Sequence, residues 1–131
     1  MSSIFTKIIN REIPAHIVAE NDTAIAFLDI SPLTRGHTLI IPKEETDYLF
    51  DLDNDTYSDL HLFAKEVAKG LKEAVPCLRI ATAVIGLEVP HAHIHLIPIS
   101  NMSDANFSNP KLQLTNEEMK AIANKIKTSI G

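Results

Sequence analysis

The sequence predicts an α+β fold, in which an antiparallel sheet of about five strands packs with one long helix, a short N-terminal helix and an extra C-terminal helix. Two observations lead to this prediction. Short runs of apolar and branched residues, separated by turn residues, are typical of strands. The segments with helical periodicity do not alternate with these runs one by one, as they would in a parallel α/β fold.

The N-terminal part is expected to hold a short helix and the first strands. Ile4, Phe5, Ile8 and Ile9 recur at helical spacing, and Pro14 ends whatever forms there. Three apolar runs with turn residues between them follow and are interpreted as antiparallel strands. These runs are residues 17–19, 24–30 and 37–42.

The long helix is expected between Asp53 and Pro76. Asp53 or Asp55 would cap its N-terminus, and Pro76 would end it. Its apolar stripe consists of Leu60, Phe63, Val67 and Leu71. Two further strands are expected at residues 78–85 and 89–99, followed by a loop at 101–110.

The last helix is expected to begin at a capping box of residues 115–118, with Thr115 and Glu118 as its capping pair. Its apolar stripe must dock on the rest of the protein. This stripe consists of Met119, Ile122, Ile126 and Ile130.

Size and charge limit the classes of function. The chain has 131 residues with 45% hydrophobic and 22% charged residues, which fits one globular domain. Its net charge of −5 argues against nucleic acids and anionic membrane surfaces as partners. Cys77 is the single cysteine, so we expect no disulfide and a reducing, cytoplasmic location. No secretory signal or membrane span is expected.

Residues 91–95 read His-Ala-His-Ile-His, so that His91, His93 and His95 alternate with apolar residues. Successive side chains of a strand point to opposite faces, which would place the three histidines together on one face. The pattern would also arise without a functional role, if the three histidines only made hydrogen bonds on the polar face of a strand. Because three of the six histidines lie within five residues, a catalytic or binding role is nevertheless favoured.

Clustered imidazoles suit two kinds of chemistry. A neutral imidazole is a nitrogen nucleophile near pH 7, and a neighbouring ring can pass a proton to the leaving group, which favours covalent catalysis at phosphorus without a metal. The alternative is a metal site in which His93, His95 and His37 bind an ion such as zinc. The residues alone leave both schemes open.

At residues 91–97, HAHIHLI resembles the signature of the histidine triad (HIT) nucleotide hydrolases and transferases. Residues 4–15 are similar to the start of the Hint-type branch of this family, and residues 26–43 to its nucleoside-binding strands. The resemblance extends over about residues 4–99. Residues 1–131 are therefore expected to form a single HIT domain, with about 100–131 as a C-terminal extension.

The resemblance implies roles for individual residues. His93 would be the nucleophile that takes a nucleoside monophosphate onto its ring, His95 would face the phosphate and leaving group, and His91 would help to fix the strand. His37 matches a fourth histidine near the phosphate, and Asp29 matches the carboxylate that binds the ribose hydroxyls. The apolar walls of the base pocket would be Phe5, Ile8, Phe27, Leu28, Ile30 and Leu39.

The residues by themselves favour structural roles at several of these positions. Asp29 would be read as the cap of the turn at 31–32, and Phe27 and Leu39 as plain core. For His37 a strand start and a functional role are equally compatible.

The chain departs from the family pattern in two places. Some relatives hold a structural zinc through a Cys-x-x-Cys pair and a histidine, where this chain has Ser3, Thr6 and Glu45, so no metal is expected. The glycine-rich loop before the triad is reduced here to residues 84–88, without the usual amide side chains, and its Glu88 would repel a phosphate if it faced the site.

The resemblance implies a purine nucleotide substrate, a homodimer and no cofactor. The expected reaction is hydrolysis of a purine nucleoside phosphoramidate through a nucleotidyl-histidine intermediate. Hydrolysis of dinucleoside polyphosphates and nucleotidyl transfer are alternatives within the same chemistry. A nucleotide-binding regulatory protein with incidental catalysis and a histidine-ligated metalloenzyme are alternatives from other classes.

Overall fold

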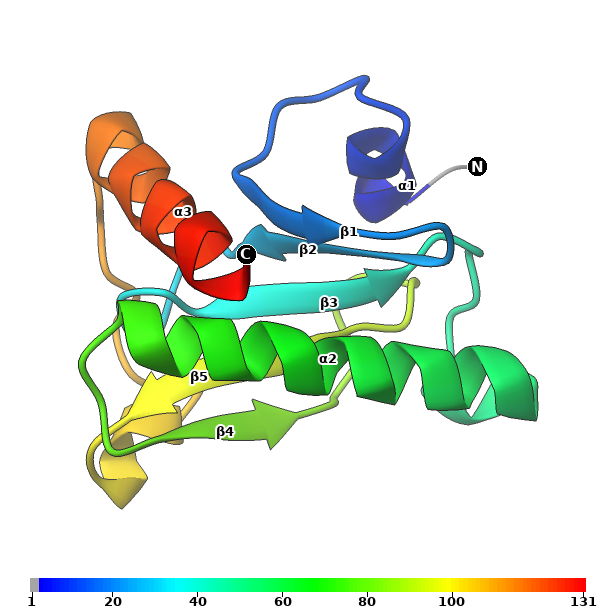
Figure 1. Cartoon of the computed structure of the whole chain (residues 1–131). Helices are drawn as coiled ribbons and strands as arrows, with labels where there is room; N and C mark the ends of the chain where they lie inside the picture. Colours follow the sequence, from blue (N-terminus) through cyan, green and yellow to red (C-terminus); the bar gives the residue numbers. More distant parts are fainter. Residues whose placement is uncertain (1–2) are drawn as a thin grey trace.

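The computed structural model describes residues 3–131 and contains a five-stranded antiparallel sheet in the order β1-β2-β3-β5-β4 (Figure 1). The strands are β1 (Ile17–Glu20), β2 (Ala24–Leu28), β3 (Thr38–Pro42), β4 (Arg79–Ala83) and β5 (Ile94–Ile99). The α-helices are α1 (Ile4–Ile9), α2 (Asn54–Ala74) and α3 (Asn116–Ile130). The short 3-10 helices are η1 (Leu49–Asp51) and η2 (Met102–Ala105). The predicted α+β class, with a long helix and two smaller helices, is confirmed.

Side chains cap the N-termini of α2 and α3 as predicted. The Asp53 carboxylate caps α2 by accepting a hydrogen bond of 2.7 Å from the Thr56 N–H. Thr115 and Glu118 form a reciprocal capping box at the start of α3. Over residues 3–131, none of the helices combines the length and the apolar character that a membrane crossing requires.

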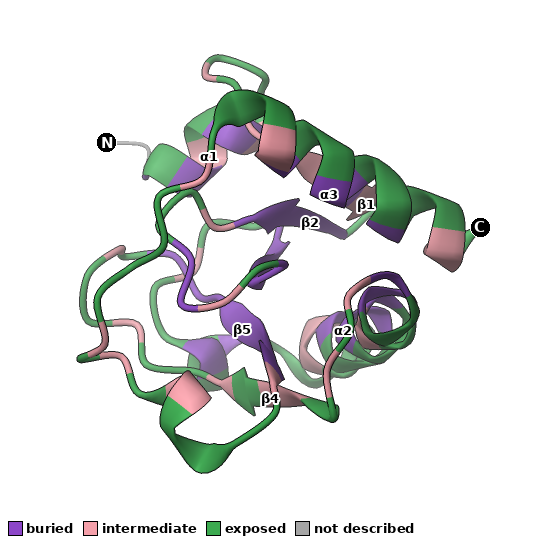
Figure 2. Cartoon of the chain, turned by 90° about the vertical axis from the view of Figure 1, so that its left-hand side faces the viewer, coloured by how far each residue is buried: buried purple, intermediate pink, exposed green. Residues whose placement is uncertain are grey.

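The two faces of the sheet carry two separate apolar cores. α2 and α3 cover one face, and their buried residues are turned toward the strands (Figure 2). α1 packs on the opposite face, where Phe5 and Ile8 meet strand residues. Because side chains alternate along a strand, Ala26 of β2 belongs to the first core and Phe27 to the second.

Strand β5, which carries His95, is shorter than predicted. β5 begins at Ile94 rather than at 89, because Pro90 has no N–H and the His91 N–H donates to the Val89 carbonyl at 2.8 Å, which closes a turn. The pairing with β4 ends at the Ala83–His95 pair. His91 and His93 therefore lie in the segment that leads into β5.

Gly36 lets the loop before β3 pass close to the end of α2. Its φ of +89° disfavours L side chains, and a Cβ atom there would lie 2.9 Å from Val75 Cγ2 and 3.1 Å from Leu71 Cδ1. We predict that Gly36→Ala lowers the free energy of unfolding by about 2–4 kcal/mol, through backbone strain and overpacking. Urea denaturation measures this change.

Gly86 provides a matched control for this prediction. Its φ is +74°, but a Cβ atom there would meet nothing within 4 Å. Gly86→Ala should therefore cost only the backbone strain, about 1 kcal/mol. Equal losses in the two variants would show that packing against α2 contributes nothing.

Candidate active site

The four histidines of interest are buried on the face of the sheet that α1 covers. The exposed fractions are 1% for His37, 0% for His91, 6% for His93 and 8% for His95. His37 immediately precedes β3, and His95 lies in β5 opposite Leu39. Of the three alternating histidines, only His95 belongs to a strand. The predicted alternation nevertheless holds, because Ala92 and Ile94, which lie between the histidines, pack in the core under α2 and α3.

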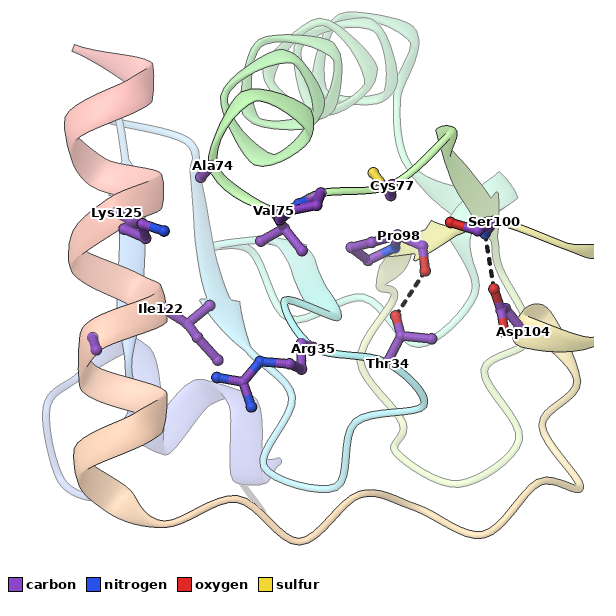
Figure 3. Close-up of a pocket in the computed structure, with 12 residues that line it drawn as sticks. Thr34, Arg35, Ala74, Val75, Cys77, Pro98, Ser100, Asp104, Ile122 and Lys125 are labelled. Carbon is purple, nitrogen blue, oxygen red and sulfur yellow. Dashed lines mark hydrogen bonds between the residues drawn. The ribbon is translucent and has the colours of Figure 1, made fainter.

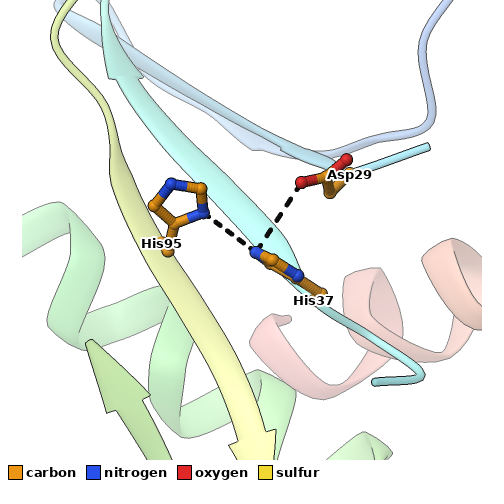
Figure 4. A group of neighbouring side chains, drawn as sticks. All are labelled: Asp29, His37 and His95. Atoms are coloured by element: carbon orange, nitrogen blue, oxygen red, sulfur yellow. Dashed lines mark hydrogen bonds and ion pairs between the residues drawn. The ribbon is translucent and has the colours of Figure 1, made fainter. Parts of the chain in front are cut away.

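The hydrogen bonds of His37 and His95 define where their protons lie. The Leu33 N–H donates to His37 Nδ1 at 3.0 Å, so the neutral His37 ring carries its proton on Nε2. That proton faces His95 Nδ1 at 2.9 Å (Figure 4). Neutral His95 therefore carries its own proton on Nε2, where it is free to act as a donor.

Burial keeps both rings of this pair uncharged near neutral pH. It lowers the pKa of His37 to about 3, with a smaller effect of the neighbouring His95. It also lowers the pKa of His95 to about 4, with a smaller effect of His93. The hydrogen bond between the two rings is thus maintained across the physiological pH range.

His93 presents the opposite arrangement of its ring nitrogens. Its Nδ1 lies 2.7 Å from the carbonyl oxygen of His91, which only accepts hydrogen bonds, so Nδ1 carries the proton. The lone pair of a neutral His93 ring is therefore on Nε2. The His93 ring centroid lies 5.0 Å from that of His95 and 5.1 Å from that of Phe5. A nucleophilic nitrogen and a proton donor thus occupy neighbouring rings.

His91 is tied to the start of the chain by hydrogen bonds. Its Nε2 donates to the Pro42 carbonyl at 2.7 Å, and the Ser3 hydroxyl donates to its Nδ1 at 2.9 Å. Glu45 accepts from the Ser3 N–H at 2.7 Å and from the Thr6 hydroxyl at 2.5 Å. These bonds lower the pKa of Glu45 to about 2, first through the Ser3 N–H. The cluster anchors α1 beside the carbonyl that orients His93.

This cluster does not fit a zinc ion. The Ser3 and Thr6 hydroxyls are poor zinc ligands and already hydrogen-bond within the cluster, which leaves only Glu45 and His91 as groups of the ligand type.

Asp29 directly follows β2 and uses its two oxygens differently. Oδ1 accepts a hydrogen bond of 2.9 Å from the Ser31 N–H, which caps the turn, as the residues alone suggested. Oδ2 lies 3.7 Å from His37 Nε2, and within residues 3–131 it accepts no hydrogen bond. Burial raises the pKa of this carboxyl, opposed by the Ser31 N–H. One oxygen therefore stays available toward the histidines.

Asp29, His37 and His95 form the one group within residues 3–131 whose donor atoms lie close enough together, within 4.8 Å, to hold a metal ion (Figure 4). Binding an ion would require a lone pair on His37 Nε2. The proton would then move to Nδ1 and face the Leu33 N–H. The hydrogen-bond directions therefore oppose a metal, and the group does not include His93, which the metal scheme required.

The apolar residues assigned to the base pocket divide between the two faces. Four of them pack together on the histidine side, with the Phe5 and Phe27 rings 5.5 Å apart. These four are Phe5, Ile8, Phe27 and Leu39. Ile30 is 76% exposed beyond the end of β2. The assignment of Leu28 is corrected, because its side chain alternates to the other face and packs in the core under the helices.

Two residues near the histidines were not predicted. Phe107 lies with its ring centroid 4.9 Å from that of His95. The charge of Lys111 influences the pKa of both Asp29 and His37. Both residues belong to the segment expected to be loop or extension, and a single aromatic residue among Asn, Ser and Pro gives no periodic signal.

A separate cavity of about 860 Å³ lies between the end of α2, the helix α3 and the loop before β3 (Figure 3). Its lining includes Val75, Cys77, Pro98 and Ile122, with Arg35 and Lys125 supplying positive charge. No histidine lines it. The cavity is therefore distinct from the histidine site.

Comparisons with known proteins identify the family of the chain. The HIT domain family model matches residues 10–102. An uncharacterized HIT-like protein of Borreliella burgdorferi is 36% identical over 135 residues, which cover 97% of each chain. Adenosine 5′-monophosphoramidase of Schizosaccharomyces pombe is 33% identical over 132 residues, which cover 99% of each chain.

A solved structure has the same fold over nearly the whole length. It is a Hit-like protein involved in cell-cycle regulation from Bartonella henselae, with a TM-score of 0.85 and 32% sequence identity. The match covers 98% of this chain and 96% of that chain. From the sequence motif, the fold and these matches together, the chain belongs to the HIT domain family.

Proposed function

We propose that the protein hydrolyses purine nucleoside phosphoramidates through a nucleotidyl-His93 intermediate. The observation that carries this proposal is the arrangement of ring nitrogens described above. Hydrogen bonds leave a lone pair on His93 Nε2 and a proton on His95 Nε2, in rings whose centroids are 5.0 Å apart. A nucleophile and an acid on adjacent rings are what a displacement at phosphorus requires.

In the first step, the lone pair of His93 Nε2 attacks the α-phosphorus and the bond from phosphorus to the leaving nitrogen breaks. His95 Nε2 gives its proton to that nitrogen, which leaves as the free amine. The phosphorylated His93 ring gains a positive charge and keeps its Nδ1 proton on the His91 carbonyl. This charge and the hydrogen bond from His37 Nε2 stabilise the imidazolate anion that His95 becomes when it gives up its only ring proton.

In the second step, water attacks the phosphorus of the intermediate. His95 Nε2 takes a proton from this water, and the bond from phosphorus to His93 breaks. The nucleoside monophosphate is released, and both rings return to their starting protonation. The sum of the two steps is consumption of one water for each phosphoramidate cleaved.

The nucleoside is proposed to bind beside these rings. The free Oδ2 of Asp29 would accept hydrogen bonds from the ribose hydroxyls. The apolar cluster around Phe5 and Phe27, on the same face, would pack against the base, with Ile8, Leu39 and the exposed Ile30. Similarity to the phosphoramidase of S. pombe supports an adenosine phosphoramidate as first substrate.

Trapping the intermediate tests the proposal. The protein is mixed with adenosine phosphoramidate radiolabelled at phosphorus and, in parallel, with labelled diadenosine polyphosphates, then quenched rapidly in alkali. We expect an acid-labile, alkali-stable adduct that maps to His93, formed faster from the phosphoramidate. A faster adduct from the polyphosphate would indicate a dinucleoside polyphosphate hydrolase. Nucleotide binding without any adduct would leave only a nucleotide-binding protein, and adduct transfer to a nucleotide acceptor would indicate a transferase.

We also propose that the protein is a homodimer and acts in the cytoplasm. β4 is an edge strand of the sheet and is only partly buried, and the apolar Leu62 of α2 and Val84 after β4 are exposed, which supports pairing with a second copy. The unpaired Cys77 is compatible with a reducing compartment. Sedimentation equilibrium measures the oligomeric state.

A further inference from the structure

The segment that joins β5 to α3, residues 100–115, returns to the histidine site. Its Phe107 ring lies with its centroid 4.9 Å from that of His95 and 6.3 Å from that of His37. The planes are nearly perpendicular, at 76° and 82°. Phe107 thus covers both rings of the hydrogen-bonded pair. It lies beyond residue 102, where the match to the family model ends.

Hydrogen bonds hold the part of this segment that carries Phe107. The Lys111 ammonium donates to the carbonyl of Phe107 at 2.8 Å and to that of Asn109 at 3.2 Å. The Leu112 N–H donates to the Pro32 carbonyl at 2.9 Å, which joins the segment to the loop after β2. The Phe107 ring is therefore positioned by a closed turn with a fixed attachment.

The bond between His37 and His95 depends on both rings remaining neutral. A proton added to His95 Nδ1 would face the proton on His37 Nε2, and the two donors would repel each other. His95 would then lose the contact that directs its Nε2. Water reaching the pair would favour this extra proton, because hydration stabilises the charged form of an imidazole.

The charged and titratable groups around the pair come from three elements. Asp29, after β2, lies 3.7 Å from His37 Nε2, and His93 precedes β5. Lys111, in the segment itself, disfavours a positive charge on His37. Phe107 adds an uncharged ring that is in edge contact with both histidines of the pair.

We propose that Phe107 is a positioning residue of the active site, whose ring excludes water from the His37–His95 pair and so holds the Nε2 proton of His95 toward the leaving group. Lys111 holds the turn that carries this ring. The effect on turnover rests on the proposed function. The effect on the protonation of His95 does not, because it is measured without substrate.

The experiment compares Phe107→Ala with the unchanged protein by NMR titration of the His95 ring. In the unchanged protein we expect His95 to titrate with a pKa of about 4. In Phe107→Ala we expect this pKa to rise toward its ordinary value by about one pH unit, as water enters. The acid limb of the kcat/KM profile should move to higher pH by the same amount, with a loss of about fivefold at pH 4 and about twofold at pH 5.

Three further variants separate positioning from general damage. Phe107→Leu keeps an apolar cover and should restore most of the low pKa. Met102→Ala changes a 91% exposed residue of the same segment and should change neither the pKa nor the profile. Lys111→Met should also raise the pKa of His95, by less than Phe107→Ala does. This variant provides the readout if Phe107→Ala does not fold.

An unchanged His95 titration in a folded Phe107→Ala would overturn the proposal, whether or not the protein turns over phosphoramidates. A shift of equal size in Met102→Ala would also overturn it. If the unchanged protein shows no turnover but Phe107→Ala shifts the titration, the positioning role stands and the proposed function fails.

Discussion

His93→Ala should lower kcat/KM for adenosine phosphoramidate by about four orders of magnitude, because no other group offers a lone pair at that position. The structure makes the expectation specific to one atom. The Nδ1 of His93 is engaged with the His91 carbonyl at 2.7 Å, so Nε2 alone is left to form the bond to phosphorus. Steady-state kinetics measure the loss, and the trapped adduct should disappear with it.

Two controls distinguish lost chemistry from lost structure. His61→Ala changes an exposed histidine on α2, away from the site, and should leave kcat/KM within about twofold. In His93→Gly, added imidazole should restore part of the turnover by occupying the vacated space. A His93→Ala protein that keeps a tenth or more of the activity would contradict nucleophilic catalysis by this residue.

His95→Asn should slow the release of an amine by about 10²- to 10³-fold, because it removes the proton donor. The Asn side-chain oxygen can still accept the hydrogen bond that His37 Nε2 now gives to His95 Nδ1 at 2.9 Å. The variant therefore deletes Nε2–H while preserving the partner of His37. Its kcat/KM is measured with adenosine phosphoramidate and with a 4-nitrophenyl ester of AMP.

The comparison between leaving groups is the informative part of this experiment. Nitrophenolate leaves without a proton, so its release should slow by tenfold or less. The unchanged protein serves as reference for both substrates. An equal loss with the two substrates would show that His95 orients the phosphate but does not protonate the leaving group.

The sequence predicted the face on which the histidines lie better than the element that carries them. Alternation with Ala92, Ile94 and Leu96 was sufficient, since these apolar residues belong to the core under the helices. The strand start depended on Pro90 and on which backbone groups found partners across the sheet. The same alternation, applied to β2, would have placed Leu28 away from the base pocket.

The protonation pattern of the site was beyond sequence analysis. It depends on the Leu33 N–H, supplied by the loop before β3, and on the His91 carbonyl, whose direction is set by an irregular segment. Phe107 was missed for a related reason, because a lone aromatic residue in a loop carries no period. Contacts between distant loops decide such details, and local patterns do not encode them.

The link between Ser3 and His91 has a practical consequence for recombinant work. The Ser3 hydroxyl hydrogen-bonds the histidine whose carbonyl orients His93, so we expect a tag or cleavage scar fused before Ser3 to disturb this link. An affinity handle after the exposed Gly131 avoids this interference. Rates compared between preparations should therefore come from proteins with identical leading residues.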